Sequence, residues 1–309
     1  MKIRLTIRRI KSILEKDTTS FASYLILGLF YLIKYELKDK AKIAKHSSRN
    51  NSLVSFSIAA SILYAIILNC DVYAQIDNDK LSEDEDKFFV AKMRADYDNQ
   101  YELVELYSSY WNEGDIALSH PNEENLEYTM QLPGQHGVQY FSVSEIRSNV
   151  ASLKAEGVDI VSYDLEKEYS SNSDLKDPVA SVKTASEIVH QYNMKFMITP
   201  SIMLTADFGA QFAPFVDIYN IQAQSLQSRP NEYNNFVEQT VRELRSANPE
   251  ISISAQVSTA RGSLENMKKS IASVIDIVDG TSSWYTDDRK GLNKLSGFIK
   301  WFNDKYRQE

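Results

Sequence analysis

Cysteine is almost absent from this chain of 309 residues, and the single residue, Cys70, excludes an internal disulfide framework. The four histidines, His46, His120, His136 and His190, show no spacing typical of zinc ligands, so neither a metal site nor a cofactor is expected. Glycine is also scarce, with 10 residues, and no Gly-rich phosphate loop follows any of the apolar runs.

Positive charge is concentrated at the beginning of the sequence. Residues 1–50 carry about 12 Lys and Arg against about 4 Asp and Glu, although the whole chain has a net charge of -8. The remainder is therefore strongly acidic, which is typical of a soluble body. Binding to nucleic acid needs a face rich in Lys and Arg, so the acidic body is not expected to bind nucleic acid.

One uncharged and mostly apolar run occupies residues 52–69, and it is about as long as a bilayer crossing requires. Basic residues precede the run, which favours a cytoplasmic N-terminus and a body outside the cell. Small residues within 72–74 form a signal-peptidase pattern. Residues 52–74 are therefore predicted to be a signal peptide or an uncleaved anchor. An uncleaved anchor would attach the protein to the membrane through residues 52–70. Either alternative predicts a secreted or cell-surface protein.

The sequence divides into four parts by composition. A basic region, 1–51, precedes the predicted signal segment, 52–74. Residues 75–87 are acidic and lack apolar periodicity, which indicates a linker. Residues 88–309 form the predicted globular domain.

Within the globular domain, short apolar runs alternate with helical patterns. We expect strands at 103–107, 158–165, 195–199, 215–223, 251–257 and 278–284. We expect helices at 144–155, 178–191, 231–247, 264–277 and 292–302. This alternation implies parallel βαβ units and an α/β fold of the (β/α)8 TIM-barrel type, whose first strands the pattern leaves poorly defined. An open doubly wound sheet is the alternative, and the missing Gly-rich loop argues against it.

Two carboxylates mark the strand expected at 158–165. Because side chains alternate along a strand, Ser162, Asp164 and Glu166 share one face, which points into a barrel. Two neighbouring carboxylates raise each other's proton affinity, which suits a general acid. Asp164 and Glu166 are therefore the candidate catalytic residues, although two carboxylates that cap the next loop would give the same pattern.

Amides and aromatic rings mark two later strands. Asn220, Gln222 and Gln224 share one face, and such side chains suit the hydroxyl groups of a ligand or form a polar layer inside the barrel. Trp284 and Tyr285 are adjacent, so one of the two faces inward, where it could stack on a ring. These five residues and Ser162 are the candidate substrate-binding residues.

The motif formed by Asp159, Asp164 and Glu166 resembles the D-x-x-D-x-D-x-E strand of the family 18 glycoside hydrolases, which are chitinase-like barrels. Residues 195–200, 217–224 and 278–287 are similar to later strands of that family. The resemblance covers about residues 157–302, and the same motifs also resemble uncharacterised secreted barrel proteins of microbes.

The resemblance implies acid catalysis on an extracellular polysaccharide or glycan. Glu166 would protonate the glycosidic oxygen, and Asp164 would orient the N-acetyl group of the substrate. Trp284 would form the floor of the sugar site. Two positions depart from the family, since Ser162 replaces an Asp and Gln224 replaces a Tyr. A carbohydrate-binding barrel without catalysis and a structural barrel of the cell envelope are therefore the alternatives.

Overall fold

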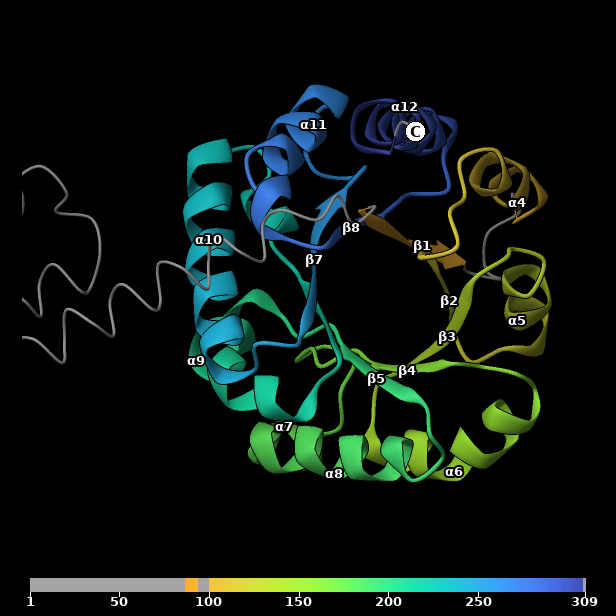
Figure 1. Cartoon of the computed structure of the whole chain (residues 1–309), viewed down its shortest axis with the longest axis vertical. Coiled ribbons are helices and arrows are strands. Elements are labelled where there is room, and N and C mark those ends of the chain that lie inside the picture. The colour runs from red at the N-terminus through yellow and green to blue at the C-terminus, as the bar shows by residue number, and fades with distance from the viewer. Residues whose placement is uncertain (1–86, 94–99, 308–309) are drawn as a thin grey trace, which may run out of the picture. The chain divides into compact units, whose positions relative to one another are not determined.

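Eight parallel strands close into a barrel in the order β1-β2-β3-β4-β5-β6-β7-β8 (Figure 1). The computed structural model describes residues 87–93 and 100–307, which belong to a unit that runs from Glu85 to Glu309. The predicted (β/α)8 fold is thus confirmed, and the open sheet is excluded. The expected basic region and signal segment lie outside the described residues. Within the described residues, no helix has both the length and the apolar character needed to cross a bilayer.

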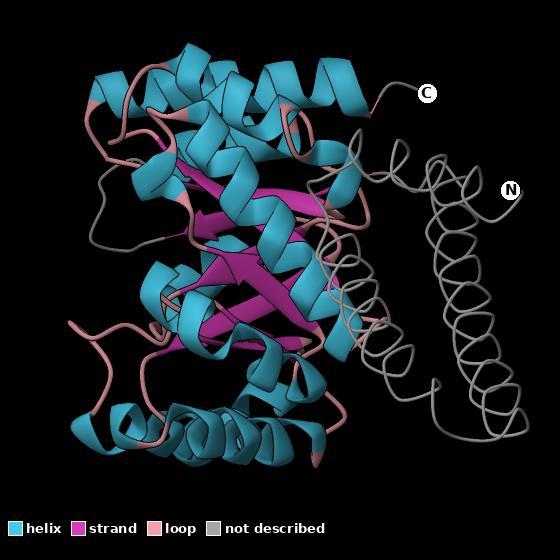
Figure 2. Ribbon diagram, turned by 90° about the vertical axis from the view of Figure 1, so that its left-hand side faces the viewer, coloured by secondary structure: helices cyan, strands magenta, loops and turns pink. Residues whose placement is uncertain are grey.

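The helices surround the strands (Figure 2). The strands are β1 (Phe88–Met93), β2 (Ile116–Ser119), β3 (Gln135–Tyr140), β4 (Ile160–Tyr163), β5 (Lys195–Ile198), β6 (Ile218–Ile221), β7 (Ser252–Ser258) and β8 (Gly280–Trp284). The helices are α4 (Gln100–Ser108), α5 (Glu123–Thr129), α6 (Val143–Ala155), α7 (Asn172–Lys176), α8 (Pro178–His190), α9 (Ile202–Phe212), α10 (Pro230–Ala247), α11 (Leu264–Ala272) and α12 (Arg289–Tyr306). Three short 3-10 turns are η1 (Ala213–Phe215), η2 (Gln224–Leu226) and η3 (Ile275–Ile277).

The expected elements in the second half of the domain are confirmed, including the N-cap of α8 at Asp177, whose side chain accepts from the backbone of Ala180. The expectation of a strand at 103–107 was wrong, because these residues lie within helix α4. The pattern also missed strands β1, β2 and β3. Strand β2 is paired with β1 on one side and β3 on the other, and these partners decide its conformation.

Alternation along the strands separates two apolar layers. Outward side chains pack against the helices in one large core, which contains Phe89, Tyr163 and Tyr219. Inward side chains near the amino ends of the strands form a small second core. Its buried members are Val90, Ile116, Leu118, Ile160, Met197 and Ile218. The inner faces become polar further along each strand, toward the carboxyl ends.

The barrel closes where β8 pairs with β1, with Gly280 opposite Phe88. A Cβ at position 280 would lie 2.5 Å from the carbonyl oxygen of Phe88, which is closer than two such atoms can approach. Glycine is therefore required at this position for the first and last strands to meet.

An aspartate stands directly before each even-numbered strand, where it accepts a hydrogen bond from the backbone of the preceding odd strand. The four bonds run from Phe89 N to Asp115 (2.6 Å), from His136 N to Asp159 (3.1 Å), from Phe196 N to Asp217 (2.7 Å) and from Ile253 N to Asp279 (2.7 Å). A basic side chain lies beside each aspartate. These side chains are Arg307, His136, His190 and Arg245, respectively. The amino end of the barrel thus has a fourfold repeat of carboxylates that fix the strand starts.

The pair formed by Asp115 and Arg307 is the most buried of the four, with both side chains 1% exposed. Arg307 also donates to the carbonyl oxygen of Lys87, at 2.7 Å, and to that of Tyr110, at 3.2 Å. The guanidinium therefore joins the end of helix α12 to the starts of β1 and β2.

We predict that Arg307→Met lowers the free energy of unfolding by about 3–5 kcal/mol, because it leaves the Asp115 carboxylate buried without a cation. Urea denaturation followed by circular dichroism measures this change. Arg242→Met is the matched control, since Arg242 pairs with Glu238 at the surface and its loss should cost less than about 1 kcal/mol. Equal stabilities of the two variants would contradict the structural role of Arg307.

Candidate functional site

Four polar side chains meet at the carboxyl end of the barrel, where sites of barrel enzymes are found. Lys92 comes from β1, Gln139 from β3, Asp164 follows β4, and Gln222 follows β6. All four are buried, with 3–7% of each residue exposed. Their neighbours along the strands pack into the outer core, so these side chains point into the barrel.

Hydrogen bonds link these side chains into one network. Lys92 Nζ donates to Gln139 Oε1 at 3.2 Å, and Gln139 Nε2 donates to Asp164 Oδ2 at 2.6 Å. From the other side, Gln222 Nε2 donates to Asp164 Oδ1 at 3.2 Å and also contacts Glu166 Oε1. One ammonium group, two amides and two carboxyl groups from four strands are therefore connected.

The Gln222 side chain is itself fixed in position. Its Nε2 also lies 3.0 Å from the carbonyl oxygen of Thr199, and its Oε1 accepts from Gln224 Nε2 at 3.0 Å. The predicted grouping of Asp164, Glu166, Gln222 and Gln224 is thus present in the structure. Their roles as catalytic or substrate-binding residues stay predictions.

Asp164 is poised for proton transfer near neutral pH. Burial is the largest of the effects that together raise the pKa of its carboxyl group to about 7, and the neighbouring Glu166 acts in the same direction. The charge of Lys92 and the hydrogen bond from Gln222 act in the opposite direction. A carboxyl group with this pKa exchanges its proton readily at pH 7, which suits a general acid or base.

Lys92 and Gln139 were not found from the sequence. Both lie on strands that the pattern missed, so their inward direction could not be assigned. The signal was present in residues 88–93, where a lysine interrupts an otherwise apolar run, FFVAKM. A charged residue within such a run, if it belongs to a barrel strand, faces a polar partner inside the barrel.

Ser162 and Asn220 lie one step below this network, two residues before Asp164 and Gln222. Both are fully buried. Asn220 Oδ1 accepts from Ser254 Oγ at 3.0 Å and from Ser282 Oγ at 2.7 Å, which forms a polar layer across the barrel. In the part of the chain that the structure describes, Ser162 Oγ and Asn220 Nδ2 have no hydrogen-bond partner. The structure thus places these two candidates in the barrel interior, below the carboxylates.

Of the two adjacent aromatic residues in β8 and after it, Trp284 faces inward. It continues the inner face formed by Gly280 and Ser282 and is half-buried. Tyr285 is 1% exposed and belongs to the core between barrel and helices. The prediction that Tyr285 contacts substrate was therefore wrong, because strand alternation directs its ring away from the barrel interior.

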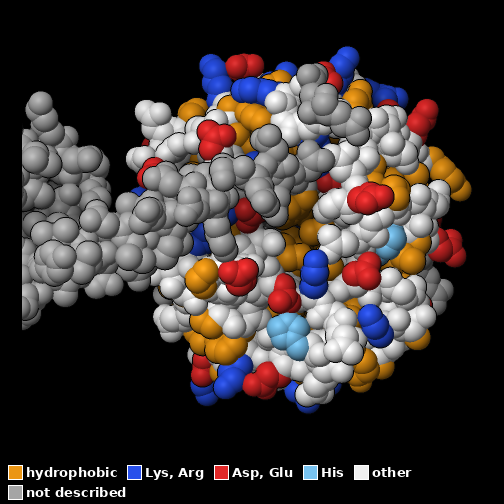
Figure 3. Space-filling view, viewed as in Figure 1, with side chains coloured by type: hydrophobic (Ala, Val, Ile, Leu, Met, Phe, Trp, Pro, Cys, Tyr) orange, Lys and Arg blue, Asp and Glu red, His pale blue; other side chains and the backbone are white. Residues whose placement is uncertain are grey.

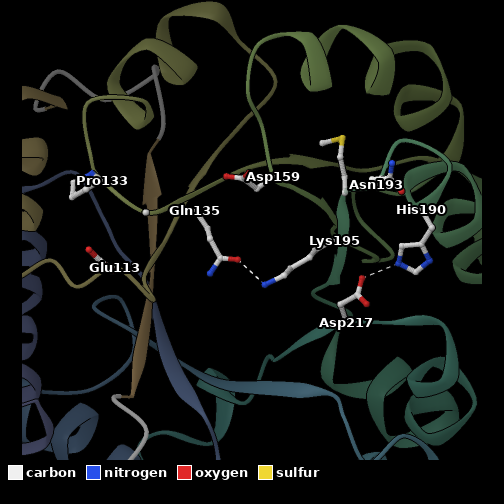
Figure 4. A pocket seen from close by; sticks show the side chains of 10 residues that line it. Glu113, Pro133, Gln135, Asp159, His190, Asn193, Lys195 and Asp217 are labelled. Atoms are coloured by element: carbon white, nitrogen blue, oxygen red, sulfur yellow. Dashed lines mark hydrogen bonds and ion pairs between the residues drawn. The ribbon is translucent and has the colours of Figure 1, made fainter.

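A cavity of about 690 Å³ lies at the opposite, amino end of the barrel (Figure 4). Its lining includes Gln135, Asp159, His190, Lys195 and Asp217. Four of these side chains form two pairs, since Lys195 Nζ donates to Gln135 Oε1 at 2.8 Å and His190 pairs with Asp217 at 2.8 Å. On the face seen in Figure 3, acidic and basic side chains are mixed. Groups at this end of a barrel serve stability, so we place the functional site at the carboxyl end.

The described residues contain no candidate metal site. Among residues 87–93 and 100–307, no three His, Cys, Asp or Glu side chains are grouped so that they could hold one ion.

Searches against known proteins returned similar structures but no relatives by sequence. No family model matches the chain, and no curated protein matches it. A structure from Aquifex aeolicus VF5 is 11% identical, with a TM-score of 0.50, over 74% of this chain and 97% of that one. A structure described as a deoxyribose-phosphate aldolase from Toxoplasma gondii ME49 is 9% identical, with a TM-score of 0.46, over 76% and 100%.

An orotidine 5'-monophosphate decarboxylase from Methanocaldococcus jannaschii is 9% identical, with a TM-score of 0.44, over 71% of this chain and 99% of that one. At such identities the likeness establishes the barrel fold alone.

These comparisons correct the expected family and activity. The family 18 glycoside hydrolases were expected, yet no family model matches the chain, and none of the three structures above is described as a glycoside hydrolase. The predictions of a glycoside hydrolase, of a carbohydrate-binding or envelope barrel, and of an extracellular polysaccharide or glycan as partner were therefore wrong. The predicted membrane anchor at residues 52–70 lies outside the described residues. The resemblance rested on strand-end motifs, and strands of any barrel enzyme end in polar residues. What the chain shares with these structures is the TIM-barrel fold.

Proposed function

We propose that this barrel is an enzyme that transfers a proton to and from carbon in a small carbonyl compound, with Asp164 as the base. The observation that carries the proposal is the hydrogen-bonded network that joins Lys92, Gln139, Asp164, Gln222 and Glu166. It combines a basic carboxylate with a fixed cation at the end of the barrel where substrates bind.

The carboxylate supplies the base that this chemistry requires. A carbon acid next to a carbonyl group loses its proton slowly in water, and a positioned base with a pKa near the working pH accelerates the transfer. Burial gives the Asp164 carboxyl group a pKa of about 7. Glu166, which is half-buried and shares the Gln222 amide with Asp164, is placed to exchange that proton with solvent.

The Lys92 ammonium group supplies the opposite charge. When the C–H bond breaks, a new O–H bond forms on Asp164, and the electron pair moves to the carbonyl oxygen as an enolate. Lys92 is 6% exposed and interacts electrostatically with Asp164. A cation held in such a poorly hydrated environment stabilises the negative charge of the enolate more strongly than it would in water. Return of the proton to the same or another carbon completes an isomerisation or a racemisation.

We predict protein-dependent exchange of carbon-bound hydrogen for deuterium when small carbonyl compounds are incubated with the protein in D2O. Proton NMR of a panel of ketones, aldehydes and keto acids measures the exchange. Asp164→Asn should lower the rate by about 100-fold or more, because an amide cannot accept the proton. Asp207→Asn, at an exposed position of helix α9, is the matched control and should leave the rate unchanged. The proposal fails if no panel member exchanges, or if both variants behave alike.

The exchange rate should depend on pH with a defined sign. The base works only when it is deprotonated, so the rate rises with pH through a midpoint near 7 and then levels off. Glu166→Gln removes a charge that raises the pKa of Asp164, so the midpoint should move to lower pH. Lys92→Met removes a charge that lowers this pKa, so the midpoint should move to higher pH. Rate profiles between pH 5 and pH 9 test the two opposite shifts, and shifts in the same direction would contradict the assignment of the base.

A further inference from the structure

Three aromatic rings lie in a row at the carboxyl end of the barrel. The ring centroids of His120 and Phe141 are 5.7 Å apart, and those of Phe141 and Tyr169 are 5.5 Å apart. We call these three residues the aromatic wall. His120 and Phe141 are half-buried, and Tyr169 is 65% exposed. The wall therefore keeps ring surface open to a ligand.

The backbone places the aromatic wall beside the network. His120 follows the last residue of β2 and continues the inner face of Ile116 and Leu118. Phe141 follows the last residue of β3 and continues the inner face of Gln139. The Phe141 ring thus stands one step further out along β3 than Gln139, which donates to Asp164, and His120 follows the neighbouring strand β2.

Tyr169 is held next to Glu166 by a turn. Its backbone N–H donates to the carbonyl oxygen of Glu166 at 3.2 Å, and that of Ser170 donates to the same oxygen at 2.8 Å. The Ser170 hydroxyl accepts from Glu166 N at 3.0 Å and donates to the carbonyl oxygen of Asp164 at 3.1 Å. The turn that carries the Tyr169 ring is thus tied to the backbone of both carboxylates.

Amides line the other side of the same end. Gln222 and Gln224 follow β6, and Gln256 belongs to the inner face of β7. Gln256 is 2% exposed, and its Nε2 has no hydrogen-bond partner among the described residues; the same holds for Gln224 Oε1. A buried amide donor without a partner is costly, and it indicates a position where an oxygen atom of a ligand binds.

From the aromatic wall on one side and the amides on the other, we infer that the substrate is a planar ring compound with oxygen substituents. The inference rests on the proposed proton transfer and narrows its substrate class. Aromatic side chains favour flat ring faces over saturated carbon, because offset stacking adds to simple burial. The amides would bind the oxygen atoms at the edge of the ring, and the carbonyl group would then face Asp164 and Lys92.

Binding of two matched ketones tests the substrate class. 4-Hydroxyacetophenone carries a planar ring, and 4-hydroxycyclohexyl methyl ketone carries hydroxyl and acetyl substituents at the corresponding positions of a saturated ring of similar size. Ligand-observed NMR titrations with the full chain give both dissociation constants, and deuterium incorporation into the methyl group is read from the same samples. We expect the planar ketone to bind about three- to tenfold more tightly.

Variants of the aromatic wall show whether it causes the preference. Phe141→Leu and Tyr169→Leu should each reduce the preference for the planar ketone to about twofold or less. Tyr169 is largely exposed, so its variant should fold normally. Tyr192→Leu, in the connection between α8 and β5 at the amino end, is the control and should keep the full preference.

The outcomes separate this inference from the proposed function. Equal affinities for the two ketones, or a preference that survives both wall variants, overturn the inference. Exchange in open-chain carbonyl compounds, without binding of the planar ketone, would also overturn it and leave the proton transfer standing. A preference that depends on the wall, without any exchange, would support the ring site and reject the proton transfer.

Discussion

Closure of the parallel sheet is the constraint on which the rest of the structure depends. Once β8 pairs with β1 through Gly280, every inward side chain shares one enclosed interior with those of the other strands. In an open doubly wound sheet the same residues would face covering helices and not one another. Inside a closed barrel they must bind one another, and the network around Asp164 is the result.

The two ends of the barrel meet this constraint in different ways. At the amino end, each aspartate before an even strand binds a backbone N–H and lies beside a basic side chain. The carboxyl groups there are engaged in fixing strand starts. At the carboxyl end, Asp164 and Glu166 are held by the amide of Gln222 and lie near the ammonium of Lys92. In this second arrangement, burial is the main cause that raises the pKa of the Asp164 carboxyl group to about 7.

The cavity at the amino end shows that the presence of a cavity does not by itself identify a binding site. It has a well-defined lining, but Lys195 already donates to Gln135, and Asp217 lies beside His190. At the carboxyl end, by contrast, amide atoms of Gln224 and Gln256 are buried without partners among the described residues. Unsatisfied polar atoms, more than volume, indicate where a ligand would bind.

The sequence by itself determined the barrel class, most elements after residue 143 and the grouping of Asp164, Glu166 and Gln222. These features follow from local periodicity, from helix caps such as Asp177 and from alternation along single strands, all of which a linear sequence records. The sequence did not supply Lys92 and Gln139, because the apolar pattern did not reveal strands β1 and β3, which carry them. Nor could it choose between Trp284 and Tyr285, since alternation defines two faces but not which face is inside. Tertiary structure decided these points, because only strand pairing and barrel closure bring residues 72 positions apart, such as Lys92 and Asp164, within electrostatic reach.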